Sequence, residues 1–317
     1  DNNVTGSVKK HVKQAIPAYV ILIVIFVVMS MVSPSFRKIG NYRNIVAQTA
    51  VLAIVSIAQC NVLLIGGIDM SVSSVISFGT IAMAMFSTKG ALGLAGSLAL
   101  AIGVGMLTGL VNGLGVVKFR IPAMIITIST QAFLKGICLV LMPSSGGKVN
   151  ADFAAFMKTR FGVLNMTAIF ALILYAVFFV IYHYTHYGRS VYAIGNSEVC
   201  AEQSGIATKK YIVLTYVLSG AIAGLAGVAL SARIATGNPL VGDSYAMNSV
   251  AAAVVGGISM NGGIGTVLGT MAGSVIMQLI NNVINNVDIS PYYQYITKGM
   301  VLVLSLMIFQ MKRRKRA

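Results

Sequence analysis

Charged residues are scarce in this sequence of 317 residues, and acidic residues are the scarcest of them. Only 9% of the residues are charged and only seven are Asp or Glu, whereas 57% are hydrophobic. Several apolar runs approach the length of about 20 residues that a helix needs to cross a bilayer. A soluble domain does not need such runs, and the strands of an outer-membrane barrel would alternate apolar and polar residues. The composition therefore predicts an all-α protein, a polytopic bundle of transmembrane helices.

Cysteine and histidine are also rare, and their placement excludes several kinds of site. Cys60, Cys138 and Cys200 form no CxxC pair, which argues against a disulfide framework and against a metal centre. The three histidines do not accompany an acid and a nucleophile in a catalytic arrangement. The sequence also lacks the G-x-x-x-x-G-K-S/T loop that holds nucleotide phosphates. We therefore expect no enzyme activity, no metal and no cofactor on this chain.

Ten apolar segments are candidates for membrane-spanning helices. The eighth is short and rich in glycine, so we expect a broken or partly inserted helix there. The connections between the segments are short, which predicts a single membrane domain over residues 1–317. The segments are residues 16–32, 45–66, 70–87, 91–117, 121–142, 166–184, 211–232, 246–259, 263–287 and 293–310.

Basic residues predict how these segments are oriented. The net charge is +16, but the basic residues are scattered between apolar segments and cluster only in KRRKR at residues 312–316. Such a tail is typical of a cytoplasmic end that meets anionic lipid headgroups, rather than of a nucleic-acid-binding protein. Ten spans would place both termini and residues 187–211 in the cytoplasm, and residues 143–165 outside with Tyr292, Tyr293 and Tyr295. The excess of basic residues on the inner side is small, so a chain with fewer spans stays possible.

The longest polar interruption is residues 187–211, YGRSVYAIGNSEVCAEQSGIATKKY. Gly195, Asn196 and Ser197 have turn and N-cap chemistry, Glu198 suits a first helical turn, and Gly205 suits a left-handed helix stop. The pattern predicts one surface helix of about two turns. By polarity alone, the segment is either a solvated connection or a docking element.

Glycines recur at helical spacing in two of the later segments. Small residues let helix backbones approach closely, and we expect them to pack helices within one bundle rather than to form a dimer seam. The run GGIDMS at residues 66–71 also resembles GGISMN at residues 256–261, which by itself does not establish a duplicated fold. The recurring glycines are Gly220, Gly224 and Gly227 in one segment and Gly265, Gly269 and Gly273 in the other.

Few polar residues lie within the apolar segments, and these are the candidates for a transport pathway or a gate. Asp69 is at the junction of the second and third segments, where the neighbouring Gly66, Gly67 and Ser71 favour a helix cap over a gate. The other candidates are mostly neutral amides, which would suit an uncharged polyol but also bond helices together. The full set is Gln59, Asn61, Asp69, Ser71, Asn112, Gln131, Asn281 and Asn282.

Two lysines, Lys135 and Lys298, are further charges within apolar segments, and the sequence leaves open whether they snorkel or pair. Proton-coupled carriers place ionisable groups deep in the membrane. Because this chain has almost none there, we expect its energy to be supplied by another protein.

Five stretches of the sequence together carry a family resemblance: GGIDMSVSS (66–74), GLVNGLGVVKFRIPAMIITI (109–128), GRSVYAIGNSEVCAEQSGI (188–206), AAAVVGGISMNGGIGTVLGT (251–270) and PYYQYITKG (291–299). In this order they resemble the permease subunits of bacterial ABC importers for monosaccharides, the ribose, xylose, arabinose and galactoside group. Ser73 and Ser74 replace the usual Gly-Ser, and Ile128-Ser129-Thr130 stands where Leu-Gly-Thr is common. The motifs therefore do not fix the subfamily.

The resemblance implies an ABC importer permease fold in the bacterial inner membrane, with two permease chains, a homodimer being favoured over a heterodimer. A periplasmic binding protein would deliver the sugar, and a separate cytoplasmic ATPase, holding ATP and Mg, would drive alternating access. Glu198, Ala201 and Gly205 match the family's E-A-A then G pattern, so residues 187–211 would hold the cytoplasmic coupling helix. The expected ATPase-coupling residues are Arg189, Gly195, Asn196, Glu198, Ala201, Glu202 and Gly205.

Charged residues in the expected external connections are candidates for contact with the binding protein, although solvated loops are the favoured explanation for them. Three other hypotheses stay open: a related ABC permease for autoinducer-2, a nucleoside or a branched-chain amino acid; a secondary sugar carrier; and a membrane scaffold. An amino-acid cargo would call for charged groups in the pathway, which are sparse. The candidate contacts are Asp152, Lys158, Arg160, Arg233 and Asp243.

Overall fold

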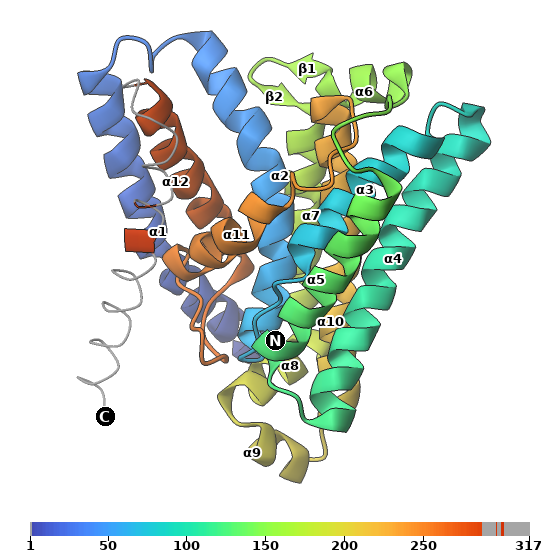
Figure 1. The fold of residues 1–317 in the computed structure, drawn as a ribbon. Coiled ribbons are helices and arrows are strands. Elements are labelled where there is room, and N and C mark those ends of the chain that lie inside the picture. Colours follow the sequence, from blue (N-terminus) through green and yellow to red (C-terminus); the bar gives the residue numbers. More distant parts are fainter. Residues whose placement is uncertain (1, 287–295, 297–298, 301–317) are drawn as a thin grey trace.

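The computed structural model describes residues 2–286, 296, 299 and 300, which form a bundle of helices with one small hairpin (Figure 1). One end of the bundle carries α6, β1 and β2 and is called the α6 end; the other carries α8 and α9 and is called the α9 end. The two strands pair antiparallel. In order, the elements are α1 (Asn2–Val32), α2 (Ile39–Leu64), α3 (Val72–Phe86), α4 (Gly90–Phe119), α5 (Ala123–Leu141), α6 (Ala151–Lys158), β1 (Arg160–Phe161), β2 (Leu164–Asn165), α7 (Met166–Tyr184), α8 (His186–Asn196), α9 (Glu198–Gln203), α10 (Thr208–Ile234), α11 (Asp243–Val255) and α12 (Val267–Asn286).

Seven of the described helices are long and apolar enough to cross a membrane: α1, α2, α4, α5, α7, α10 and α12. α3 has 15 residues and α11 has 13. They therefore extend roughly 22 and 20 Å, short of a hydrocarbon core of about 30 Å. The polytopic helical bundle is confirmed, but the expectation of ten membrane segments was wrong. Two segments are helices too short to cross the membrane, α3 and α11. Segment 293–310 lies almost wholly outside the described residues, as do the expected interfacial tyrosines and the basic tail.

α2 and α10 form the buried centre of the bundle. Every residue of α2 from 50 to 64 is buried, and α10 is buried along most of its length. By contrast, α1 and α5 leave most of their apolar side chains exposed, including Val24, Phe133 and Val140. Such side chains suit contact with lipid, so α1 and α5 form much of the periphery.

α4 and α10 cross in backbone contact because glycines face each other. A Cβ on Gly105 would lie 2.1 Å from the carbonyl oxygen of Gly220, and one on Gly220 would lie 1.9 Å from that of Gly105. Gly227 packs in the same way against α3, and Gly273 of α12 packs against α11. The expected packing of small residues within one bundle is confirmed. Gly265, however, lies before α12, with a φ of 127°, rather than on the helix.

The two similar runs GGIDMS and GGISMN both follow a helix, but they do not correspond residue for residue. After α2, the residue with a left-handed backbone is Gly66, with a φ of 80°; after α11 it is Gly257, with a φ of 93°. When the two runs are aligned, however, Gly66 pairs with Gly256, the residue before Gly257. The likeness reflects the same way of ending a helix on a glycine. The two regions also meet, because the N–H of Gly263 donates to the carbonyl oxygen of Leu64 at 2.9 Å.

The connection between α10 and α11 runs back along α3 instead of staying at the α6 end (Figure 1). The N–H of Asn238 donates to Oγ1 of Thr80 at 3.2 Å. Further along the chain, the N–H of Gly242 donates to Oγ of Ser77, one turn earlier in α3, at 3.0 Å. α11 therefore begins at Asp243 beside the first half of α3, within the bundle.

The expected external loop, residues 143–165, is largely ordered. Oδ1 of Asn150 accepts from the N–H of Phe153 at 3.0 Å and caps α6. Oδ1 of Asn165 accepts from the N–H of Ala168 at 2.9 Å and caps α7. Capping oxygens of this kind satisfy N–H groups that the helix itself leaves free, so the α6 end presents a defined surface.

Candidate functional site

Two short helices, α8 and α9, form the α9 end of the bundle, and α9 has a cap at each end. Oγ of Ser197 accepts from the N–H of Cys200 at 3.3 Å. After α9, Gly205 adopts a φ of 82°, and its N–H donates to the carbonyl oxygen of Glu202 at 3.0 Å. Glu198 lies in the first turn, where its charge suits the helix dipole. The predicted N-cap, acidic first turn and left-handed stop are therefore confirmed.

Residues 187–211 nevertheless hold two helices and the start of α10, not the single helix expected. Gly195 and Asn196 belong to the last turn of α8 rather than to a turn before α9. α8 is amphipathic, with Gly188, Val191 and Ile194 buried at three-residue spacing. This periodicity was present in the sequence but was masked by the glycines and polar residues between the buried positions.

Gly195 joins this element to two breaks between helices. A Cβ on Gly195 would lie 1.9 Å from the carbonyl oxygen of Leu64, at the end of α2, and 2.4 Å from the nitrogen of Gly263, before α12. A side chain does not fit there without movement of backbone. Because neither contact leaves free space, a rigid displacement of α8 would be passed directly to α2 and to the start of α12.

Tyrosines fasten α8 to the bundle. The hydroxyl of Tyr187 lies 3.0 Å from Oγ1 of Thr215 and donates to Oδ1 of Asn61 at 3.3 Å. The hydroxyl of Tyr192 donates to the carbonyl oxygen of Gly265 at 2.8 Å. Burial raises the pKa of Tyr187 and of Tyr192 above the ordinary phenol value, so both hydroxyls stay protonated and can donate. Asn61, a pathway candidate, thus bonds helices together in this state.

Asp69 organises a second polar group, where α2 gives way to α3. Its Oδ1 accepts from the N–H of Ser71 at 3.0 Å and from Oγ of Ser71 at 2.6 Å, and its Oδ2 accepts from Oγ of Ser219 in α10 at 3.0 Å. Asn112 of α4 donates to Ser71 at 2.9 Å and accepts from Thr130 of α5 at 2.7 Å. Asp69 holds Ser71, the N-cap residue of α3, but no side chain caps the free N–H groups of α3 itself. The group ties three other helices, α4, α5 and α10, to the break between α2 and α3.

The remaining pathway candidates are dispersed. Asn282 exchanges two side-chain hydrogen bonds with Asn41, of 3.2 and 2.8 Å. Gln59 is fully buried, and neither its amide oxygen nor its amide nitrogen has a hydrogen-bond partner among the described residues. Asn281 is also buried, and its amide oxygen likewise has no partner among the described residues. Unpaired buried amides are costly, which sets these two residues apart from the candidates with identified partners. Of the set, only Asp69, Ser71 and Asn112 come together in one group, and contact with cargo stays a prediction for all eight.

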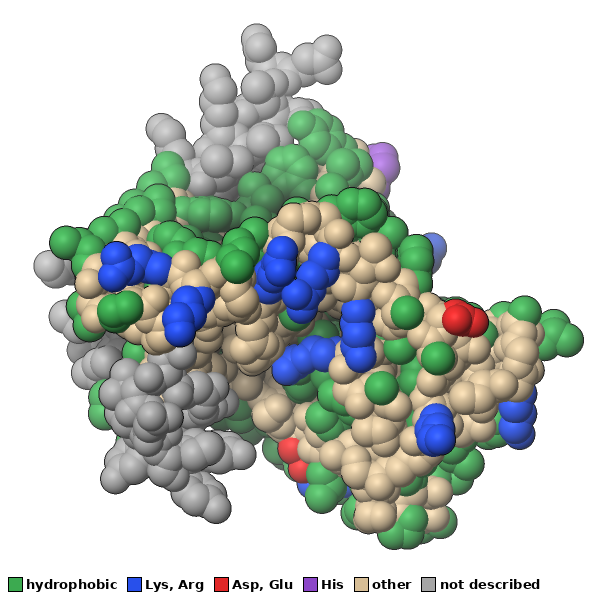
Figure 2. Space-filling view, turned by 90° about the horizontal axis from the view of Figure 1, so that it is seen from above, with side chains coloured by type: hydrophobic (Ala, Val, Ile, Leu, Met, Phe, Trp, Pro, Cys, Tyr) green, Lys and Arg blue, Asp and Glu red, His purple; other side chains and the backbone are tan. Residues whose placement is uncertain are grey.

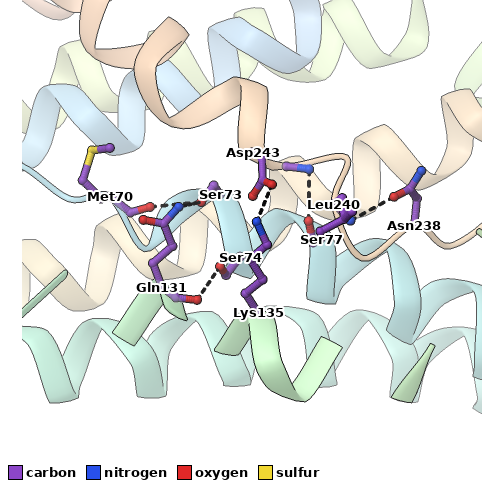
Figure 3. A network of polar contacts seen from close by, with 10 residues as sticks. Met70, Ser73, Ser74, Ser77, Gln131, Lys135, Asn238, Leu240 and Asp243 are labelled. Carbon is purple, nitrogen blue, oxygen red and sulfur yellow. Dashed lines mark hydrogen bonds and ion pairs between the residues drawn. The ribbon is translucent and has the colours of Figure 1, made fainter. Parts of the chain in front are cut away.

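The structure also contains an ion pair that the sequence did not predict. Nζ of Lys135 in α5 lies 2.6 Å from Oδ2 of Asp243 in the first turn of α11 (Figure 3). Gln131, four residues before Lys135 in α5, donates to Oγ of Ser73 at 2.9 Å in the same region. Asp243 therefore lies within the bundle, not in the external connection where we expected it. A lone lysine in an apolar segment was the available signal, but its partner is 108 residues away.

The other four candidates for contact with a binding protein are exposed toward the α6 end: Asp152, Lys158, Arg160 and Arg233. Figure 2 views the molecule from this end, where basic side chains are spread over the surface and acidic side chains are few. Contact with another protein stays a prediction for these residues. Among the described residues, no group of three or more His, Cys, Asp or Glu is arranged to hold a metal ion.

Seven apolar helices long enough to span a membrane, two shorter helices between them and polar groups at the helix breaks are features of integral-membrane transport proteins. The family described as branched-chain amino acid transport system / permease component matches residues 41–306. The chain therefore belongs to this permease family.

Relatives similar along most of their length carry names for sugar import. The ribose import permease protein RbsC of Haemophilus influenzae is 36% identical over 296 residues, covering 92% of this chain and 91% of the relative. The same-named protein of Escherichia coli K12 is 34% identical over 301 residues, covering 92% of each chain. The galactose/methyl galactoside import permease protein MglC of H. influenzae is 27% identical over 317 residues, covering 94% of each. No solved structure matches the chain. The resemblance to sugar-importer permeases is confirmed.

Proposed function

We propose that this chain is the membrane-spanning permease subunit of an ATP-driven importer that passes a monosaccharide across the bacterial inner membrane. The relatives named for ribose and for galactose import support the cargo class, because the similarity covers nearly the whole chain. The observation that carries the mechanism is α9: a short exposed helix, capped at both ends and held through α8 to two helix breaks.

α9 has the surface of a docking helix. Ala201 is buried against the bundle, whereas Val199 is 65% exposed and Glu198 and Glu202 point to solvent. An exposed apolar residue flanked by acids suits a cleft on a separate cytoplasmic ATPase, which would hold the ATP and Mg. Closure of that ATPase would displace α8 and α9 together. Gly195 would pass the displacement to α2 and to the start of α12.

The α6 end would then face the periplasm and receive the binding protein. Its exposed basic side chains suit a partner with acidic docking surfaces, and opposite charges speed the encounter of two proteins. This orientation keeps α9 in the cytoplasm, as the sequence predicted for residues 187–211. A second permease chain, most simply an identical one, would complete the importer.

Glu198→Lys is expected to weaken docking of the ATPase while leaving the bundle folded, because Glu198 is exposed and makes none of the contacts that hold α8. We expect sugar uptake in proteoliposomes, and the ATPase recovered per permease on purification, to fall roughly tenfold, a change of about 1.4 kcal/mol. Asp152→Lys reverses the same charge at the opposite end and is the matched control. It should leave ATPase recovery unchanged. Normal ATPase recovery and uptake with Glu198→Lys would refute the role of α9.

A branched-chain amino acid is a second candidate cargo, because the charges of a zwitterion would match the Lys135–Asp243 pair. The ligand held by the binding protein that works with this permease distinguishes a sugar cargo from an amino-acid cargo. Isothermal titration of that protein with ribose, galactose and leucine should show binding of a sugar and no binding of leucine. Binding of leucine alone would overturn the sugar assignment while leaving the permease function intact.

A further inference from the structure

The Lys135–Asp243 pair lies at the depth of the spanning helices, not at either end of the bundle. Lys135 is within α5 (Ala123–Leu141), about 9 Å from its last residue along the helix axis. Asp243 follows Gly242, whose N–H bonds to Ser77 inside the bundle. The pair is therefore held inside the thickness that α5 would span in a membrane.

Both side chains are nevertheless accessible on the surface of the protomer, with 34% of Lys135 and 41% of Asp243 exposed. Lys135 does not snorkel toward an interface, because its ammonium group is held 2.6 Å from the carboxylate. Charged groups that face hydrocarbon cost several kcal/mol each and are normally turned toward protein or water. This part of the surface is therefore not a lipid contact.

The same helix carries an apolar face that does suit lipid. Phe133 is 72% exposed and Val140 is 83% exposed. On an α-helix, Phe133 is rotated about 200° from Lys135, and Val140 about 140°. α5 is thus exposed on this side and also on the side of Gln131 and Lys135, where Ile128 and Leu139, within about 40° of Lys135, are exposed as well.

We propose that Gln131 and Lys135 of α5, with Asp243 and Ser244 of α11, form a wall of the sugar passage that a second copy of the chain completes, and that the ion pair binds sugar hydroxyls in transit. We call these four residues the α5–α11 face. The proposal rests on the function proposed above. Figure 3 shows three of them, Gln131, Lys135 and Asp243, among the polar groups of α3 and α11.

The chemistry of the pair fits an uncharged polyol. A sugar hydroxyl both donates and accepts, so it can bond to the carboxylate of Asp243 and to the ammonium of Lys135 at once. When the sugar leaves, the two charged groups close on each other again, so neither charge is left unpaired. Because the ion pair re-forms when the sugar leaves, the hydrogen bonds to the sugar are weak enough to let it pass. In a two-fold symmetric pair of chains, the same residues would stand on the opposite wall.

Thiol labelling tests whether the α5–α11 face is wet, without depending on transport. The assembled complex of permease, ATPase and binding protein is placed in lipid nanodiscs after Cys200→Ser removes the exposed cysteine; Cys60 and Cys138 are buried. Ser244→Cys and Gln131→Cys are compared with Phe133→Cys, using a charged, membrane-impermeant methanethiosulfonate with and without ATP and Mg.

We expect Ser244→Cys and Gln131→Cys to be modified at least about tenfold faster than Phe133→Cys in one of the two nucleotide states. Thiols in water ionise and react, whereas thiols in lipid do not meet a charged reagent. Equal rates at the three positions, or no modification at Ser244→Cys and Gln131→Cys in either state, would overturn the proposal. This outcome would leave the proposed permease function standing.

Protection by cargo and a charge exchange test the binding role. Saturating ribose, or galactose if the binding protein prefers it, should slow modification of Ser244→Cys at least about threefold. Lys135→Ala and Asp243→Ala should each lower uptake at least about tenfold, and Lys135→Asp combined with Asp243→Lys should recover part of it. Unchanged labelling with sugar, together with normal uptake by both alanine variants, would overturn the binding role. No uptake by the unaltered complex would instead count against the proposed function.

Discussion

Gly105→Leu is expected to be among the most damaging single substitutions in the protein. The new side chain would begin 2.1 Å from the carbonyl oxygen of Gly220, so α4 and α10 would have to separate. Overpacking typically costs about 1–3 kcal/mol and occasionally more, and α10 is central to the buried bundle, so we expect the upper end of that range. The Tm of the detergent-purified protein should fall by roughly 6–12 °C.

Gly103→Leu is the matched control, since it adds the same side chain to the same helix. Apart from its chain neighbours and the backbone of its own helix, no atom lies within 4 Å of the position that its Cβ would occupy. Its Tm and yield should stay close to those of the unaltered protein, because leucine also favours a helix over glycine. If both leucine variants unfold at the same temperature, the close crossing of α4 and α10 is not what limits stability.

Asp69→Ala is expected to cost the protein both stability and transport. The carboxylate accepts three hydrogen bonds, two from Ser71 and one from Ser219. Their loss leaves buried donors unpaired, at about 1–3 kcal/mol for each donor that finds no new partner. It also frees the break between α2 and α3 from α10. We expect a loss of about 3 kcal/mol or more, seen as a lower Tm, and sugar uptake at background level.

Two milder variants separate the bonds to Ser71 from the tie to α10. Asp69→Asn keeps an oxygen that can accept from Ser71, and Ser219→Ala removes only the 3.0 Å bond to α10. Each should lower the Tm by roughly a third to a half as much as Asp69→Ala does, and each should retain measurable uptake. An alanine variant as stable as the unaltered protein would show that the carboxylate does not hold the break.

The capped helix at α9 shows how far local pattern alone can lead. Ser197, Glu198 and Gly205 act on their own neighbours within a few residues, and the sequence predicted all three correctly. α8 was missed because its stability comes from burying Val191 and Ile194 against other helices. Its own residues, with glycine at 188 and 195, favour a helix only weakly.

The number of membrane-spanning helices could not be predicted from local sequence. Hydropathy identified the apolar segments, but it does not distinguish a segment that crosses the bundle from one that begins half-way through it. α11 starts at Asp243 because the preceding connection bonds to Thr80 and Ser77 of α3. These hydrogen bonds join residues about 160 positions apart, which no local pattern reports.

The amino-acid sequence by itself determined that this is a helical membrane permease, where its long helices lie and how α9 is capped. Hydropathy and capping act within one helix or at one turn. Only the tertiary structure decided which polar groups meet: Asp69 with Ser219, and Lys135 with Asp243. In a low-dielectric interior each buried polar group needs a partner, and the partner is chosen by how whole helices pack.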